Sequence, residues 1–337
     1  MKRTILLLSI LLLISGGSVI NAQIYSTTTG GNWADTTTWI GYRIPTANDS
    51  VIIQGPVTFY FTNAVVKHLH LKEGGSLVDG WISTLRILGN YKIDADITAG
   101  PPQVYVGGNL EINKKWSGNT QLNFTGVLEH KIKIGASAEF GPAWIIADSS
   151  RLIALSDFKI ISVSGTETRI KEIDLSGGFN LHLTNCRLGG NGGNYTITKV
   201  KGAGNNIYFS SRRDLQHYFE NCELENINLY GYSIFTSNVK FIGTVTNVDT
   251  MVAGFTTQPI TIEGNFINNG TIPNRYLSFN CYGNIINNGL FMVSNLNFIG
   301  INDFKVKTAI GKYIDCSSLN VNDGKLIADS DLYLKVS

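Results

Sequence analysis

The sequence is short of charged residues. They make up 15% of its 337 positions, whereas roughly a quarter is usual for soluble domains. The segment 1–22 holds Lys2 and Arg3 and no acidic side chain, which leaves 25 basic and 25 acidic side chains in the rest of the chain. A neutral chain without a basic run has no electrostatic footprint for nucleic acid, and non-specific membrane binding is equally unsupported.

Cysteine is also scarce. Cys186, Cys222, Cys281 and Cys316 are too few and too dispersed for a disulfide scaffold, and no two have the spacing of a zinc site. Because cysteine is among the most buried residue types, we expect inward-facing free thiols. One or two disulfides in an oxidising compartment are the alternative.

Long apolar runs are missing after the N-terminus. The basic pair Lys2-Arg3 precedes an apolar run over residues 5–14, and small residues lead to Ala22 just before Gln23. This layout predicts a secretory signal peptide over residues 1–22, and therefore a secreted or outer-surface protein. The alternative is an uncleaved N-terminal anchor. No later segment is apolar enough to span a bilayer, so no transmembrane segment is expected after cleavage.

Glycine is abundant in the chain, and so are short segments in which apolar and polar residues alternate. There are 36 glycines but only 7 prolines, and no stretch after the leader has the apolar spacing of a helix. The alternating segments are bounded by Gly, Asn, Asp or Ser, which supply turns, so the chain is predicted to be all-β. They include residues 51–53, 66–71, 85–88, 91–97, 104–106, 130–134 and 159–163.

An internal repeat decides between all-β folds. Gly89-Asn90 recurs as Gly108-Asn109, and the similar stretches 264–270 and 283–289 are separated by the same interval. Such recurrence, at a period of about 20 residues, is the signature of a solenoid. Two consecutive β-sandwiches are the alternative that the length allows.

We therefore predict a right-handed, single-stranded parallel β-helix with coils of about 19–24 residues. Inward positions take Ile, Leu, Val and Phe, while corners take Gly or Asn, which tolerate left-handed backbone angles. Asn at equivalent corners can stack into hydrogen-bonded ladders. Asn268 with Asn287, and Asn269 with Asn288, are the expected pairs.

The N-terminal segment carries a family resemblance. From Gly30 the chain reads Gly-Gly-Asn-Trp-Ala-Asp-Thr-Thr-Thr-Trp-Ile-Gly, and from Pro45 it reads Pro-Thr-Ala-Asn-Asp-Ser-Val-Ile-Ile. This block resembles the opening of repetitive, adhesin-like secreted bacterial surface proteins, and is similar to the start of the eight-glycine domain. Where the family pattern has a second glycine, this chain has Tyr42 and Arg43. The matching residues are Trp33, Trp39, Gly41, Pro45, Asp49 and Val51.

The resemblance implies a capping region at residues 23–60, followed by a β-helix at residues 61–337. In such proteins, adhesin-like repeats and a C-terminal sorting domain for type IX secretion often follow, which implies a Gram-negative bacterium. The last residues, 332–337, look like a strand without a cap. We expect the natural chain to continue past this point.

A cap also follows from the residues themselves, because an open β-helix end exposes strand edges and core. Trp33 and Trp39 are large apolar plugs, and Pro45 has no donor to extend a sheet. Asp49 is placed to bond a backbone amide at the turn into the strand at 51–53. The functional alternative is that the tryptophans stack on sugar rings.

The densest polar cluster is the catalytic candidate. Arg212, Arg213 and Asp214 lie close to His217 and Tyr218. A polysaccharide lyase needs a base near the α-proton of its substrate and cations that neutralise a carboxylate. A surface loop between coils is the plainer interpretation.

Two pairs of residues share a strand face by alternation. Asp94 and Asp96 could hold calcium or act as acid and base, and His68 and His70 could supply two metal ligands. No third ligand is identifiable for the histidine pair. Solvated outer faces are the simpler interpretation, and no cofactor is expected apart from possible calcium.

Aromatic residues around Gly231 suggest a ligand site. Tyr230, Tyr232 and Phe235 are the candidates for a sugar-binding platform on a coil face. Aromatic stacking inside the β-helix is the alternative.

These observations favour a secreted or cell-surface structural or adhesive module without catalytic activity of its own. Its expected partner is a polysaccharide or another cell-surface protein, and not nucleic acid. The alternatives on the same fold are a carbohydrate-active enzyme (a polysaccharide lyase or hydrolase) and a carbohydrate-binding module.

Overall fold

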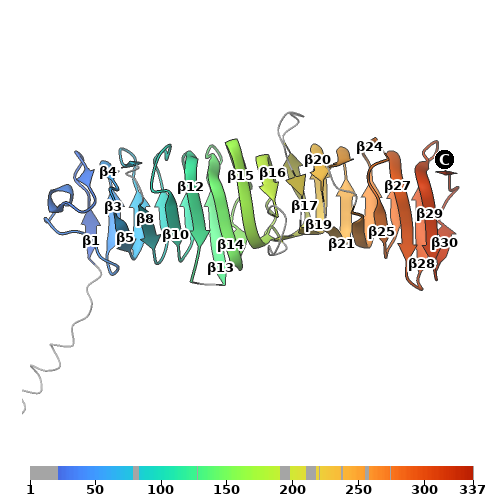
Figure 1. Ribbon diagram of the computed structural model, residues 1–337, viewed down its shortest axis with the longest axis horizontal. Coiled ribbons are helices and arrows are strands. Elements are labelled where there is room, and N and C mark those ends of the chain that lie inside the picture. The colour runs from blue at the N-terminus through green and yellow to red at the C-terminus, as the bar shows by residue number, and fades with distance from the viewer. Residues whose placement is uncertain are drawn as a thin grey trace, which may run out of the picture.

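The chain forms one long stack of parallel β-strands. In the computed structural model, the two ends of the chain lie at opposite ends of a rod (Figure 1). The predicted all-β parallel β-helix is confirmed, and two sandwiches are excluded. No helix among the described residues is long and apolar enough to cross a membrane. The structure describes residues 22–78, 83–126, 128–189, 198–209, 218–219, 221–236, 238–254, 258–273 and 275–336.

The described elements are short strands near the N-terminus and longer, kinked strands afterwards. The first half contains β1 (Gln23–Tyr25), β2 (Gly31–Asn32), the 3-10 turn η1 (Thr36–Thr38), β3 (Ser50–Ile53), β4 (Pro56–Thr58), β5 (Asn63–Val66), β6 (His68–Leu71), β7 (Ser76–Val78), β8 (Thr84–Ile87), β9 (Tyr91–Ile93), β10 (Gln103–Val106), β11 (Leu110–Ile112), β12 (Trp116–Phe124), β13 (Glu129–Ile134), β14 (Phe140–Ala154) and β15 (Phe158–Asp174). The second half contains β16 (Leu181–Leu188), β17 (Thr198–Phe209), β18 (Tyr218–Phe219), β19 (Cys222–Tyr230), β20 (Tyr232–Phe235), β21 (Val239–Asn247), β22 (Thr250–Ala253), β23 (Ile260–Asn268), β24 (Thr271–Pro273), β25 (Phe279–Cys281), β26 (Ile285–Asn287), β27 (Leu290–Ile299), β28 (Asp303–Thr308), β29 (Ile314–Asn322), β30 (Lys325–Ala328) and β31 (Leu334–Val336).

Each turn of the solenoid bends at residues that accept a left-handed backbone. Within β19 the register against β21 shifts at Asn226, whose φ is 52°. Stacked partners on successive turns are 17 residues apart for Asn280 and Asn297 but 26 apart for Asn180 and Asn206. The turns thus vary in length beyond the predicted range, because loops of different size separate the strands.

Apolar side chains fill the inside of the rod. Alternation along each strand turns every second residue inward, as in β13, where His130, Ile132 and Ile134 are buried. Full burial of a large apolar side chain stabilises the fold by roughly 1.5–3 kcal/mol, so the stacked rings contribute strongly. Rings on neighbouring turns lie 5.8 to 6.2 Å apart in the column Tyr91, Trp116, Phe140 and Phe158.

Buried asparagines form the predicted ladder. Asn268 donates to Asn287 through a 2.8 Å hydrogen bond and accepts one of the same length from Asn247. All three side chains are fully buried. A second, exposed pair, Asn288 and Asn269, is joined at 2.8 Å as predicted. Asn268 thus bonds a neighbour on each side, as burial of a polar group requires, whereas Asn247 Oδ1 has no partner among the described residues.

Glycines stack where neighbouring turns approach most closely. A Cβ atom on Gly264 would overlap the carbonyl oxygen of Gly243, and one on Gly283 would overlap the carbonyl oxygen of Gly264. The glycine repeat of the sequence therefore reflects backbone contact between turns, and not only corner geometry.

We predict that Gly264→Ala lowers the free energy of unfolding by about 1–3 kcal/mol or more, because the added methyl group must push two turns apart. Thermal unfolding followed by circular dichroism measures this. Gly100→Ala is the matched control, since its Cβ would meet other atoms at an ordinary 3.6 Å. Equal melting temperatures for the two variants would contradict the close-contact interpretation.

Candidate functional site

The N-terminal tryptophans belong to a buried cluster. Trp33 and Trp39 are 2% and 1% exposed, and their rings meet edge to face at 4.8 Å. Trp33 also stacks on Phe59 at 5.1 Å, and the indole N–H of Trp39 donates to the Trp33 carbonyl at 2.9 Å. Neither ring is available to stack on a sugar, so that alternative is wrong. Their role as a cap stays a prediction.

Asp49 holds the turn that follows this cluster. Its buried carboxylate accepts two hydrogen bonds from the Arg43 guanidinium, at 2.7 and 2.9 Å, and one from the Thr46 amide at 2.7 Å. Burial acts to raise the pKa of Asp49, but the hydrogen bonds from Arg43 and Thr46 outweigh it and keep the pKa below its usual range. The predicted amide bond is confirmed. Pro45 is buried beside it.

Tyr42, in the turn before Asp49, has a strained backbone conformation. Tyr42 occupies the left-handed region with φ 55°, directly after Gly41 with φ 94°. A left-handed conformation costs an ordinary residue roughly 1–2 kcal/mol. The Tyr42 side chain is 75% exposed, so burial does not offset this strain. Arg43, in contrast, gains its ion pair with Asp49, a role that sequence reasoning missed.

The catalytic candidates lie outside the described residues. Arg212, Arg213, Asp214 and His217 are among them, so the lyase-like cluster stays a prediction. Their neighbour Tyr218 begins β18, whose backbone pairs with β16 and β20.

The predicted sugar platform is wrong in one of its three members. Phe235 is 1% exposed and stacks on Phe219 at 4.9 Å inside the rod. Tyr230 and Tyr232 are half-buried on either side of Gly231, whose φ is 88°. The alternation of inward and outward side chains restarts after the turn at Gly231, and it places Phe235 inside the rod. The spacing of the aromatic residues in the sequence could not show this direction.

Tyr230 instead ends an outward row of aromatic rings. His182 lies 4.8 Å from Tyr208 at an interplanar angle of 18°, and Tyr208 lies 5.1 Å from Tyr230 at 31°. The rings cover one another's faces along the rod. Tyr208 therefore has no open face that could stack on a sugar. Its hydroxyl accepts a 2.9 Å hydrogen bond from Asn206 Nδ2.

Asp94 is occupied by protein partners. Its two carboxylate oxygens lie 2.6 Å from His70 Nε2 and 2.7 Å from Asn113 Nδ2. Burial acts to raise the pKa of Asp94, but hydrogen bonds from Asn113, His70 and Lys92 outweigh it and lower the pKa. Asp96 accepts a separate bond from the Lys115 amide at 2.9 Å.

The two histidines of β6 share the outer face, as alternation predicts, but they do not act as a pair. His68 Nδ1 accepts the Asn90 amide at 2.9 Å, and His70 binds Asp94. Burial lowers the pKa of His68, with a further contribution from Lys67. Within the described ranges, no three His, Cys, Asp or Glu side chains are grouped as a metal site.

All four cysteines are buried. Cys186, Cys222, Cys281 and Cys316 face the interior and none is in a disulfide, which confirms the expectation of inward-facing thiols. Burial raises the pKa of Cys186 and Cys281, so these thiols stay protonated and unreactive.

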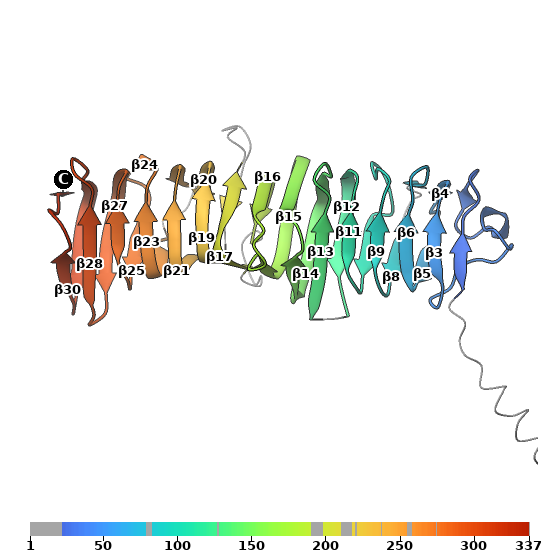
Figure 2. The same ribbon diagram turned by 180° about the vertical axis from the view of Figure 1, so that it is seen from behind.

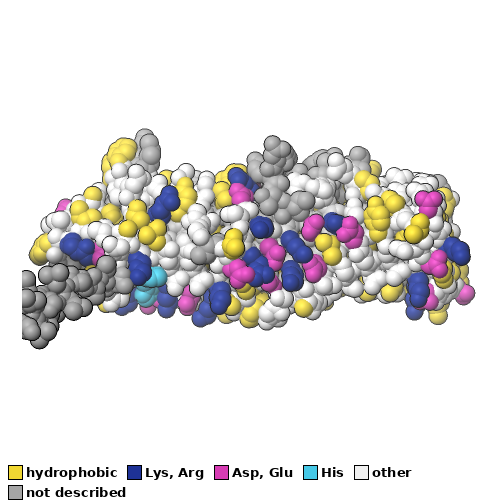
Figure 3. Space-filling model, turned by 90° about the horizontal axis from the view of Figure 1, so that it is seen from below, with side chains coloured by type: hydrophobic (Ala, Val, Ile, Leu, Met, Phe, Trp, Pro, Cys, Tyr) yellow, Lys and Arg dark blue, Asp and Glu magenta, His cyan; other side chains and the backbone are white. Residues whose placement is uncertain are grey.

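A row of alternating charges crosses the middle of one outer face. Its members sit opposite one another on adjacent turns of β13, β14, β15, β17, β19 and β21. Figure 3 shows Lys and Arg side chains mixed with Asp and Glu along this face. Arg151, for example, pairs with Glu129 and lies 3.5 Å from Glu172. This charge row consists of Glu129, Arg151, Glu172, Lys199, Glu223 and Lys240.

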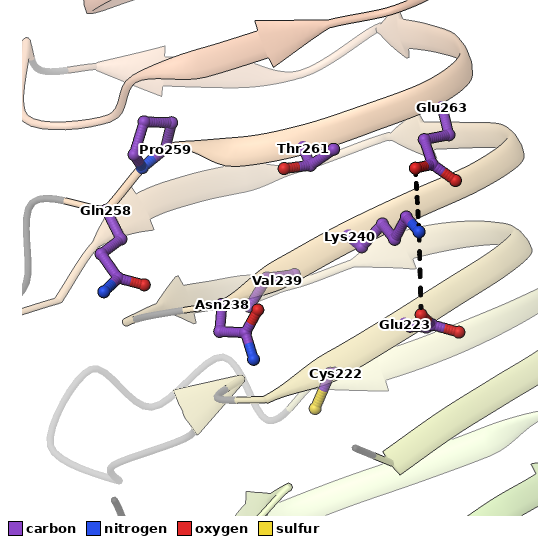
Figure 4. Close-up of a pocket in the computed structure, with 9 residues that line it drawn as sticks. All are labelled: Cys222, Glu223, Asn238, Val239, Lys240, Gln258, Pro259, Thr261 and Glu263. Atoms are coloured by element: carbon purple, nitrogen blue, oxygen red, sulfur yellow. Dashed lines mark ion pairs between the residues drawn. The ribbon is translucent and has the colours of Figure 1, made fainter.

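The charge row ends in a cavity of about 420 Å³ (Figure 4). Lys240 lies between two carboxylates, 2.8 Å from Glu263 and 3.9 Å from Glu223. The hydrogen bond from Lys240 to Glu263 is the main cause of the raised pKa of Lys240. A catalytic lysine base needs a lowered pKa. This cavity is therefore suited to contact or structure and not to proton abstraction by Lys240.

His130 is a buried histidine beneath the outer face. It is fully buried in β13, and its Nδ1 lies 2.6 Å from the Gly108 carbonyl oxygen. Its Nε2 has no partner within the described part of the chain. Burial lowers the pKa of His130 below the ordinary value of 6.5. The neutral ring is the form that the fold accommodates.

We predict that Tyr42→Gly raises the free energy of unfolding by about 1 kcal/mol, since glycine adopts the left-handed region without strain. Tyr42→Ala is the control: it removes the ring and keeps the strain. Chemical denaturation of both variants measures the difference. A gain for alanine equal to that for glycine would show that the ring, and not the backbone, is unfavourable.

We predict that the chain loses stability as pH falls below 6.5, the ordinary pKa of histidine. In the unfolded chain His130 binds a proton near pH 6.5, whereas in the folded chain it binds one only at lower pH. The loss reaches about 1.4 kcal/mol per pH unit for one such group and stops below the folded pKa. Urea unfolding between about pH 7.5 and about pH 5 measures it. His130→Leu is expected to reduce the slope and to leave the part that comes from His68, whose pKa burial also lowers. An unchanged slope in His130→Leu would exclude His130 as a source.

The comparisons with known proteins add no family to this description. No family model, curated protein or solved structure matches the chain. The N-terminal resemblance to adhesin-like surface proteins therefore stays a prediction, and function has to be argued from the geometry of the rod and its surface.

Proposed function

We propose that this chain is a secreted or cell-surface structural and adhesive module, with a polysaccharide or another surface protein as its partner. One observation carries the proposal. Outward polar side chains repeatedly bind partners on the next turn, as Arg151 does with Glu129. The row Asn280, Asn297 and Asn320 does the same, joined at 3.0 and 2.8 Å. Such a surface stiffens a rod and presents a long, regular face.

The electrostatics of the surface support a non-catalytic role. Catalytic acids and bases have pKa values moved toward neutrality. On this rod, hydrogen bonds and ion pairs move the pKa values of charged side chains away from neutrality. Those of Asp94 and Glu111 are lowered, and those of Lys199 and Lys240 are raised. Groups tuned in this direction stay charged and paired at neutral pH.

The N-terminal segment supports the proposal that the protein is secreted. Residues 1–22 have the order of a signal peptide, basic then apolar then small. The buried thiols are compatible with an oxidising compartment, because no two of them are placed to form a bridge and their thiolates are disfavoured.

We expect purified residues 23–337 to be retained on one or more members of an array of acidic and neutral polysaccharides, without release of unsaturated or reducing ends. Release that disappears in Arg213→Ala or Asp214→Ala would make the protein an enzyme and overturn the proposal. Lys171→Gln, an exposed change on β15, is the control for expression and folding. If the protein is neither retained on any polysaccharide of the array nor bound to intact cells, the adhesive role is excluded.

A further inference from the structure

Two cavities near the N-terminal end join into one groove. The first, of about 360 Å³, is lined by β3, β6 and β9, and the second, of about 340 Å³, by β9, β11 and β13. Both include Asn90 and Lys92, so they are continuous. These strands lie side by side along the rod (Figure 2), with turns about 4.8 Å apart. We call this continuous depression the lysine groove.

The outward residues of the groove follow one register. Ile52, His70 and Lys92 occupy matching positions on successive turns, and Glu111 and Lys133 continue the line. A ligand lying along the rod would therefore meet one side chain per turn at regular intervals.

Positive charge exceeds negative charge in the groove. Lys92, Lys131 and Lys133 line it, and Glu111 is the one carboxylate among the lining residues. Lys133 lies 3.4 Å from Glu111, and Lys92 lies 3.3 Å from Asp94 outside the lining. Counting both carboxylates, one net positive charge remains with the histidines neutral.

Lys131 carries that surplus charge. It is exposed on β13 and forms no ion pair with any residue that the structure describes. Most other lysines discussed above are paired with carboxylates, as Lys240 is in the cavity of Figure 4, where two glutamates outnumber the lysine. The cavity of Figure 4 and the lysine groove are therefore opposite in net charge.

Neutral polar groups complete the groove. Asn90 and Asn109 carry amides, Ser50 a hydroxyl and Gln23 a further amide, all of which can bond alcohol groups. Lysines beside amides and hydroxyls suit a ligand that bears carboxylates and many hydroxyl groups on an extended chain.

We propose that the lysine groove binds a strand of acidic polysaccharide, with uronate carboxylates at Lys92, Lys131 and Lys133 and sugar hydroxyls at the amides. This deepens the proposed adhesive function, and rests on it, by naming the partner's chemistry. Nucleic acid fits less well, because the sequence from residue 23 onward has equal numbers of basic and acidic side chains and no basic run.

The test is isothermal titration of residues 23–337 with polygalacturonate at low salt. The triple variant Lys92→Gln, Lys131→Gln, Lys133→Gln is expected to weaken binding at least about tenfold, since each exposed charge contact is worth roughly twofold to threefold. Glu111→Gln is expected to strengthen binding, because it removes a negative charge from the groove. Circular dichroism checks that each variant folds.

The matched control is the triple variant Lys171→Gln, Lys312→Gln, Lys325→Gln. It removes the same charge from exposed lysines that do not line the groove. We expect its affinity to stay within about twofold of the parent chain. Equal losses in both triple variants would show attraction by overall charge alone and would overturn the groove assignment.

Dextran and duplex DNA separate the remaining outcomes. Binding to polygalacturonate but to neither dextran nor DNA supports the proposal. Equal binding to DNA and to polygalacturonate overturns it, because the groove would then bind any polyanion. A chain retained on neutral polysaccharides or on cells, but not on polygalacturonate, would overturn the groove assignment and leave the adhesive function intact.

Discussion

The parallel register between successive turns is the constraint on which the rest of the structure depends. Because each strand lies directly over its counterpart, every side chain meets the residue at the equivalent position one turn away. Rings therefore stack on rings, as Phe235 does on Phe219, and amides bond amides, as Asn268 does with Asn287. A single turn has no such partner and no core. Stability accumulates only as turns are added, from contacts between nearest neighbours.

The same constraint explains which features could be predicted from the sequence. The class of fold and the Asn268–Asn287 contact followed from similar stretches at a constant interval, where turn length does not change and partners can be found by counting. Partners separated by 17 or 26 residues cannot be found in this way. The charge row was missed for this reason, although every member was visible as a charged residue in a strand.

Site residues were harder to predict than the fold, because their roles depend on direction and on partners far along the chain. Phe235 lies inside the rod because the alternation restarts after Gly231. Asp94 was visible as half of an acidic pair, but its partners His70 and Asn113 come from the turns before and after. Arg43 appeared only as a departure from a glycine pattern, and the structure gives it the Asp49 carboxylate.

The alternating charge row has a consequence for how a solenoid of this kind can change in length. Duplication of one turn within the row would place two like charges opposite each other, as Glu172 beside a second glutamate, whereas duplication of two turns would preserve the order of signs. In the stretch of Asn280, Asn297 and Asn320 an amide can both donate and accept, as Asn297 does, so one extra turn keeps the bonding intact there. The charged middle of the rod can therefore grow or shrink only by pairs of turns, while the amide-lined part can do so one turn at a time.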